Sequence, residues 1–304
     1  MRNALRHAGS VAVSLCLVGA VAACSGGDSD DTAGTTSTGP SLASSSMPAG
    51  SGSAGSSGAP GGAAGTVQVG PADPQPTRGS VEVIRTLAHD PALFTQGLQV
   101  VGDEIYESTG LYGRSLVQRR PLGGGAPTVS VPMAADEFGE GLAVTPDTLW
   151  TLTWNNGVAH NRDPRTLEIR SAVPYQGEGW GLCFDGTGLV MSNGSDELTF
   201  RDPVTFEPTG TLSVTAGGTP VSRLNELECA DGSILANVWM TDEILRIDPA
   251  TGAVTAIYDA SSLEQPRPAS ADGVLNGIAA LPGSGNLLLT GKMWTSLYEV
   301  RLIG

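Results

Sequence analysis

The sequence predicts an all-β protein, a five-bladed β-propeller in which an N-terminal strand closes the last blade. Five similar segments recur roughly every 40 to 50 residues along the C-terminal part of the chain, which is the length of a propeller blade. Each segment contains short apolar runs separated by Gly, Pro and Asp turns, and no long helical periodicity interrupts them.

Each repeat opens on a short motif, followed by a turn and a second apolar run. The opening motifs are Gln96-Gly97-Leu98, Glu140-Gly141-Leu142, Trp180-Gly181-Leu182, Glu226-Leu227-Glu228 and Asn276-Gly277-Ile278. The second runs cover 105–108, 149–154, 189–192, 234–239 and 287–290. A third run is clearest at 198–201 and 244–247, and Asp-Pro ends three of the repeats.

The last apolar run, 296–302, has no following strand to pair with. We expect the early run 81–86 to pair with it, because this closure leaves no open sheet edge.

The N-terminus has the features of an export signal. Residues 1–23 combine early arginines with a short apolar run that ends Val-Ala-Ala before Cys24, which is typical of a bacterial lipoprotein. We therefore expect lipidation of Cys24 and anchoring to the outer face of the bacterial cell membrane. Ordinary signal cleavage that leaves a free cysteine is the alternative.

Residues 24–78 are rich in Ser, Gly, Ala and Pro and have no aromatic side chain, which predicts a disordered tether. The propeller domain is then 79–304. Asp and Glu number 31 against 16 Lys and Arg, which argues against nucleic-acid binding. No His/Cys cluster has zinc-site spacing, so we expect neither a metal nor another cofactor, and we expect a monomer.

Four of the five blade-start residues are polar, although core positions would be apolar in every repeat. Loops on one face of a propeller converge near its axis, so these residues are candidates for one pocket. The alternative is that they only hydrogen-bond neighbouring blades. Trp154, Trp239 and Trp294 lie at the ends of second strands, where they could line the same pocket, whereas Trp150 in mid-strand indicates packing. Lys292 is the only lysine in the chain.

Seven motifs, in order, resemble the glutamine cyclotransferase family over essentially all of 89–302. They are Phe94-Thr95-Gln96-Gly97-Leu98, Tyr106 to Gly113, Phe138-Gly139-Glu140-Gly141-Leu142, Gly179-Trp180-Gly181-Leu182, Leu224 to Glu228, Ala236-Asn237-Val238-Trp239 and Thr290-Gly291-Lys292. The resemblance implies a five-bladed propeller that converts N-terminal glutamine of peptides to pyroglutamate.

The resemblance also implies which residues form the site. The family's catalytic glutamate falls on Glu140, and its pocket residues fall on Gln96, Phe138, Trp154, Trp180, Asn225, Trp239 and Lys292. Cyclisation needs a base for the α-amine and a donor for the oxyanion. We assign the first role to Glu140 and the second to Lys292, with Asn225 or Gln96.

Two other functions fit parts of the sequence. One is a non-catalytic propeller that binds a peptide or cell-wall ligand. The other is a metal-dependent lactonase-type propeller with Glu140, Asn225 and Glu226 as oxygen ligands, although such propellers usually have six blades.

Cys183 and Cys229 occupy the same position in consecutive repeats, three residues after the blade start. Export favours a disulfide between them. Two free thiols are the alternative if the inner strands lie further apart than the ~5.5 Å Cα separation of a disulfide.

Overall fold

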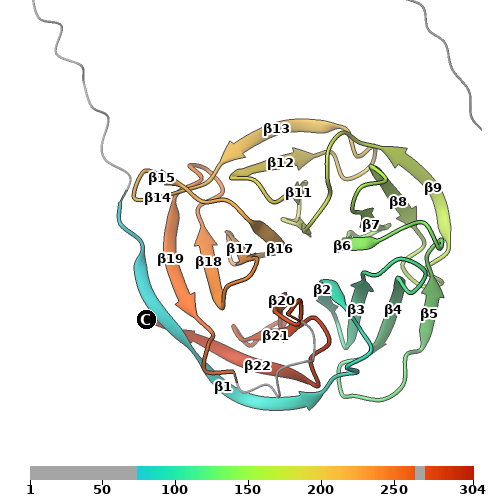
Figure 1. Cartoon of the computed structure of the whole chain (residues 1–304), viewed down its shortest axis with the longest axis horizontal. Helices are drawn as coiled ribbons and strands as arrows, with labels where there is room; N and C mark the ends of the chain where they lie inside the picture. The colour runs from blue at the N-terminus through green and yellow to red at the C-terminus, as the bar shows by residue number, and fades with distance from the viewer. Residues whose placement is uncertain (1–73, 264–270) are drawn as a thin grey trace, which may run out of the picture. The chain divides into compact units, whose positions relative to one another are not determined.

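The computed structural model describes residues 74–263 and 271–304, all within the compact unit Thr66–Gly304 (Figure 1). The predicted signal 1–23, Cys24 and the tether up to residue 73 lie outside the described residues. Among those residues every regular element is a strand, so the all-β prediction is confirmed, and no helix long and apolar enough to cross a membrane occurs there.

Three sheets contain four consecutive antiparallel strands each. Their strands are β2 (Thr95–Val101), β3 (Glu104–Thr109), β4 (Leu116–Pro121) and β5 (Val129–Pro132); β6 (Gly139–Val144), β7 (Leu149–Thr153), β8 (Val158–Arg162) and β9 (Ile169–Pro174); and β10 (Leu182–Phe184), β11 (Leu189–Met191), β12 (Glu197–Arg201) and β13 (Pro208–Ser213). A short hairpin, β14 (Thr215–Ala216) and β15 (Thr219–Pro220), follows.

The remaining eight strands form one sheet made of two antiparallel groups of four. One group is β16 (Leu224–Ala230), β17 (Ser233–Val238), β18 (Glu243–Ile247) and β19 (Val254–Asp259), and the other is β20 (Leu275–Ala280), β21 (Leu287–Gly291), β22 (Ser296–Ile303) and β1 (Thr77–Ala88). The two groups meet where β1 pairs with β19 in parallel.

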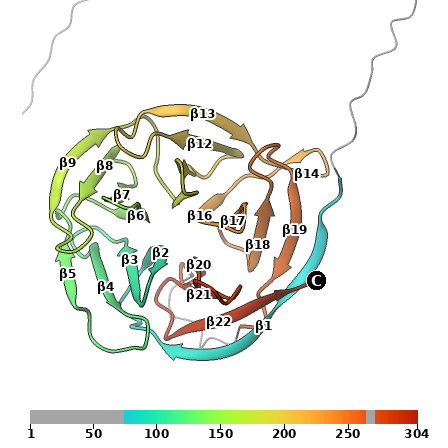
Figure 2. The ribbon, with the colours of Figure 1, turned by 180° about the vertical axis from the view of Figure 1, so that it is seen from behind.

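The first strands of the five groups surround the centre of this unit (Figures 1 and 2). Strand β2 contacts β6 and β20, β10 contacts β6 and β16, and β16 contacts β20, which completes a circle of inner strands. The last strand of each group lies on the outside. Inner strands are therefore buried on both faces, as in β6, where all six residues are buried.

The predicted pairing of the two chain ends is confirmed, because β1 pairs with β22 in antiparallel register, with Val81 opposite Leu302. Strand β1 begins two residues before Gly79, the predicted start of the domain. Thr77 and Arg78 already belong to β1, where they pair with Ala256 and Ile257 of β19.

Apolar cores lie between neighbouring sheets. Trp150 of β7 is 1% exposed and packs against Phe206 of the next sheet, with ring centroids 4.8 Å apart. Its indole N–H donates to the carbonyl oxygen of Pro203 at 2.9 Å. This is the packing role that its mid-strand position predicts.

A disulfide joins Cys183 of β10 to Cys229 of β16, with the Cα atoms 5.5 Å apart. The bond cross-links two neighbouring inner strands. Of the two alternatives left open by the sequence, the structure contains the bridged one.

Candidate active site

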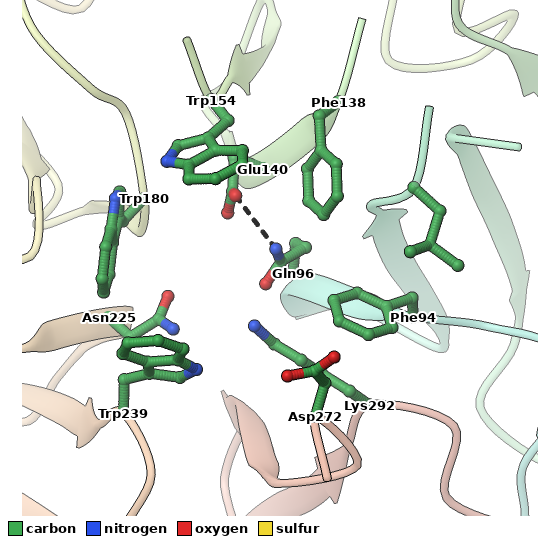
Figure 3. A pocket seen from close by; sticks show the side chains of 11 residues that line it. Phe94, Gln96, Phe138, Glu140, Trp154, Trp180, Asn225, Trp239, Asp272 and Lys292 are labelled. Carbon is green, nitrogen blue, oxygen red and sulfur yellow. Dashed lines mark hydrogen bonds between the residues drawn. The ribbon is translucent and has the colours of Figure 1, made fainter. Parts of the chain in front are cut away.

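A cavity of about 250 Å³ opens at one end of the circle of inner strands (Figure 3). The eight predicted pocket residues all line it, together with three further residues. The full lining is Phe94, Gln96, Leu111, Phe138, Glu140, Trp154, Trp180, Asn225, Trp239, Asp272 and Lys292.

Antiparallel pairing explains why these residues meet. The start of a first strand and the end of the second strand lie at the same edge of a sheet. Trp154, Trp239 and Lys292 each come directly after the second strand of their group of four. Gln96 and Glu140 each lie near the start of a first strand, so both sets face one opening.

The polar pocket residues sit at β-bulges. Pairing between β2 and β3 shifts register between Thr95 and Gly97, and the same irregularity occurs after Gly139 in β6 and after Leu224 in β16. A bulge leaves residues outside the ladder and re-aims their side chains. Gln96, Glu140 and Asn225 lie within these interruptions, which is how a buried inner strand can direct polar groups into the centre.

Backbone strain accompanies the pocket. Leu111, Met240 and Met293 have positive φ angles of 91°, 67° and 60°, although none is a glycine. Leu111 lines the cavity, and the other two directly follow Trp239 and Lys292. Non-glycine residues in this conformation concentrate at functional sites, where the surrounding structure enforces them.

Glu140 is the buried carboxylate of the site, with only 5% of its surface exposed. Gln96 Nε2 donates to Glu140 Oε1 at 2.9 Å. Burial raises the pKa of Glu140 well above its usual value, and the nearby charge of Glu178 raises it further, while Lys292 opposes this shift. The carboxyl group is therefore poised to exchange a proton nearer neutral pH.

Both ends of the Gln96 amide are engaged. Its Nε2 binds Glu140, while its Oε1 accepts a 3.2 Å hydrogen bond from Asn276 Nδ2, which also donates to the Thr95 carbonyl. Asn225 differs, because its Oδ1 is buried and has no hydrogen-bond partner among the described residues. An orphaned buried acceptor in a cavity marks a place where a ligand donor fits.

Lys292 supplies the positive charge of the pocket. Its side chain is buried, and Nζ lies 5.0 Å from the centre of the Phe94 ring. Burial lowers its pKa, while the charges of Glu140 and Asp272 counteract that shift. The Lys292 ammonium and the Glu140 carboxylate therefore each shift the pKa of the other.

Two of the residues that open repeats in the sequence serve the framework instead of the pocket. Glu226 accepts from the backbone N–H groups of Leu98 and Ile278, at 3.1 and 2.8 Å, and so ties three inner strands together. It does not line the cavity, so Glu140, Asn225 and Glu226 do not converge there. Asn276 acts through Gln96, as described above. Within 74–263 and 271–304 no group of three or more His, Cys, Asp or Glu side chains could hold a metal ion.

Trp294 is the strand-end tryptophan that does not reach the pocket. It is buried against Tyr298, and its indole N–H donates to the Gly273 carbonyl at 3.1 Å. The position after a second strand therefore indicates the pocket for Trp154 and Trp239 only, and Trp294 is part of the core.

The pocket residues that the sequence analysis did not select are Phe94, Leu111 and Asp272. The first two belong to motifs that carry the family resemblance, close to Gln96 and to the second strand, so their positions offered a signal. Asp272 lies in a loop before β20 and outside the repeat pattern, where nothing in the sequence distinguishes it.

Comparison with known proteins gives one consistent result. Residues 60–302 match the family model described as glutamine cyclotransferase. A glutaminyl-peptide cyclotransferase of Arabidopsis thaliana is 37% identical over 227 residues, which is 73% of this chain and 71% of that protein. The crystal structure of Myxococcus xanthus glutaminyl cyclase is 38% identical, with a TM-score of 0.68 over 75% of this chain and 99% of that chain.

Proposed function

This chain belongs to the glutamine cyclotransferase family and has glutaminyl-peptide cyclotransferase function, and we propose that Glu140 and Lys292 perform the chemistry on N-terminal glutamine. The observation that carries the assignment is a buried carboxylate of raised pKa in a small, mostly aromatic cavity that also contains a lysine and an unpartnered amide oxygen.

The first requirement of the reaction is a folded-back substrate. The α-amine of the glutamine must reach the carbon of its own side-chain amide, so holding that conformation supplies much of the rate enhancement. The aromatic lining is suited to clasping the short side chain and excluding water. The side-chain amide N–H donates to Asn225 Oδ1, the orphaned acceptor. Gln96, whose amide is already engaged, orients Glu140 instead.

Proton transfer then follows a balanced path through Glu140. The neutral α-amine attacks the amide carbon and forms the new C–N bond, and Glu140 takes the proton that the nitrogen loses. Lys292 donates to the oxygen of the tetrahedral intermediate. Glu140 returns the proton to the departing nitrogen, the old C–N bond breaks, and ammonia leaves pyroglutamate. Burial moves the pKa of Glu140 toward that of a peptide α-amine, ~8, which favours this exchange.

We also propose a five-bladed architecture and a location on the outside of the cell. Five four-stranded groups around a common centre support a five-bladed β-propeller, with the β1–β22 pair closing the last blade. A lipid on Cys24 and the tether after it would hold the propeller outside the cell, where peptides with N-terminal glutamine are its partners.

The test is an assay of the purified protein with a dipeptide that begins with glutamine. We expect one ammonia for each pyroglutamyl dipeptide, the same rate with EDTA, and no product from the N-acetylated dipeptide, whose nitrogen cannot attack. A propeller that only binds peptides would retain the dipeptide unchanged, and this outcome would reject the function.

A further inference from the structure

The aromatic wall of the pocket consists of two separate sets of touching rings. In one set Phe138 contacts Phe94 and Trp154, with ring centroids 6.0 and 5.5 Å apart. In the other set Trp180 contacts Trp239 at 5.6 Å. In Figure 3 Trp180 and Trp239 lie on one side of the cavity and Phe138 and Phe94 on the other, with Trp154 beside Glu140 between them. Among the described residues no ring contact joins Trp154 to Trp180, so the wall has a gap there.

The carboxylate of Glu178 closes this gap. Its Oε2 accepts from the indole N–H of Trp154 at 2.8 Å and from that of Trp180 at 2.9 Å. Trp154 follows β7, and Trp180 precedes β10 of the neighbouring sheet. One oxygen thus holds two pocket tryptophans from two sheets. Hydrogen bonds to an ionised acceptor are about twice as strong as neutral ones, so the charge matters for this link.

The loop that carries Glu178 is fixed at several points. The Tyr175 hydroxyl donates to the Thr153 carbonyl, and Gly179 N–H donates to the Trp154 carbonyl at 3.2 Å. A Cβ atom at Gly179 would collide with the Tyr175 hydroxyl, so the close approach requires glycine. The Glu178 side chain itself is exposed, but its backbone is anchored on both sides. These contacts therefore hold Glu178 in a fixed position at the rim of the pocket.

We propose that Glu178 is a positioning residue of this enzyme, which sets the two indole rings that clasp the glutamine side chain. The inference rests on the proposed function of the pocket and extends it to a residue that does not line the cavity. Without the carboxylate, both indoles lose their shared acceptor and can rotate. Substrate binding then weakens, while Glu140 and Lys292 remain in place for the chemical step.

The charge of Glu178 has a second consequence, at Glu140. The charge of Lys292 lowers the pKa of Glu140, and the charge of Glu178 raises it. Tyr175 also lies close enough to interact with Glu140 electrostatically, and Asp272 raises the pKa of Lys292. Removal of the Glu178 charge therefore lowers the pKa of Glu140. The acidic limb of kcat/KM should move to lower pH, since the base stays ionised further into acid.

Two substitutions separate the hydrogen bonds from the charge. In Glu178→Ala both are lost, and we expect KM for a glutamine dipeptide to rise about tenfold, the scale of one lost charge-assisted hydrogen bond, with kcat within about twofold. In Glu178→Gln a carbonyl acceptor remains, so KM should recover in part while the pH shift persists. Glu168→Gln is the matched control, because Glu168 is an exposed glutamate in the turn before β9.

The indole N–H resonances provide a readout that does not depend on activity. In the NMR spectrum of the full-length Glu178→Ala variant we expect the Trp154 and Trp180 signals to move, each assigned with a Trp→Phe variant. The Trp150 and Trp294 signals should stay, because their indoles donate to backbone carbonyls elsewhere.

The outcomes distinguish a failure of the proposed function from a failure of the positioning role of Glu178. An inactive wild-type protein would reject the proposed function, whereas the indole shifts would still test the link. An active wild type with unchanged KM and unchanged pH profile in folded Glu178→Ala would overturn the inference. Unmoved Trp154 and Trp180 signals would overturn it as well.

Discussion

Replacement of Glu140 by glutamine should remove the base and preserve the pocket. The glutamine oxygen can still accept from Gln96 Nε2, which lies 2.9 Å from Glu140 Oε1 in the wild type. The aromatic wall and Asn225 are unchanged, so KM should change little. Loss of a positioned proton-transfer group typically costs ~10²–10⁴-fold in kcat, or about 3 to 5 kcal/mol of transition-state stabilisation.

Stopped assays of pyroglutamate formation over a range of pH would measure this effect. Because burial raises the pKa of Glu140, wild-type kcat/KM should fall on the acidic side well above the pH at which an ordinary glutamate protonates. The Glu140→Gln variant should lose the part of that limb that Glu140 causes and retain only the fall set by protonation of the substrate α-amine, whose pKa is ~8.

Glu226→Gln is the matched control for Glu140→Gln. It is the same substitution in another buried glutamate of an inner strand, which is 1% exposed and outside the cavity. The two carboxylate oxygens of Glu226 each accept one backbone N–H, whereas the glutamine side chain has only one oxygen that can accept. We therefore expect a loss of about 1 to 3 kcal/mol in unfolding free energy with kcat nearly intact. A folded Glu140→Gln protein with kcat within about tenfold of wild type would refute the proton-transfer role.

Three further predictions concern charge, cross-link and anchor. Lys292→Met should lower kcat by ~10²–10³-fold, and Lys292→Arg should restore only part of it because a planar fork does not replace a buried ammonium; steady-state kinetics decides. Paired serine substitution of Cys183 and Cys229, which are 46 residues apart, should cost about 2 to 4 kcal/mol in chemical denaturation, and an unchanged midpoint would contradict this. Cys24→Ser should release the protein from the membrane fraction of its host, and continued membrane association would exclude the lipid anchor.

The sequence predicts the strands of this protein closely because its turns are local signals. The predicted run 149–154 is β7, Leu149–Thr153, and 244–247 is β18, Glu243–Ile247. The sequence does not predict the first residues of β1, because Thr77 and Arg78 pair only with β19, far along the chain. Long-range pairing of this kind leaves no periodic pattern in the sequence.

The sequence repeat predicts which strand ends surround the pocket, but it does not predict every side chain that faces the cavity. The bulge in β16 spans both Asn225 and Glu226, and the repeat pattern alone does not show which of the two faces the cavity. The family resemblance points to Asn225. Glu178 lies in the loop between β9 and β10, and its importance depends on two indoles that only the fold brings together.

The most direct measurement of the central claim follows the side-chain nitrogen of the substrate. A glutamine dipeptide labelled with heavy nitrogen in its side-chain amide is incubated with the purified protein, and the products are analysed by mass spectrometry. Attack by the α-amine predicts that the label leaves entirely as ammonia and that the pyroglutamyl ring retains unlabelled nitrogen. Label retained in the peptide product, or ammonia released with formation of open-chain glutamate, would contradict the cyclisation account.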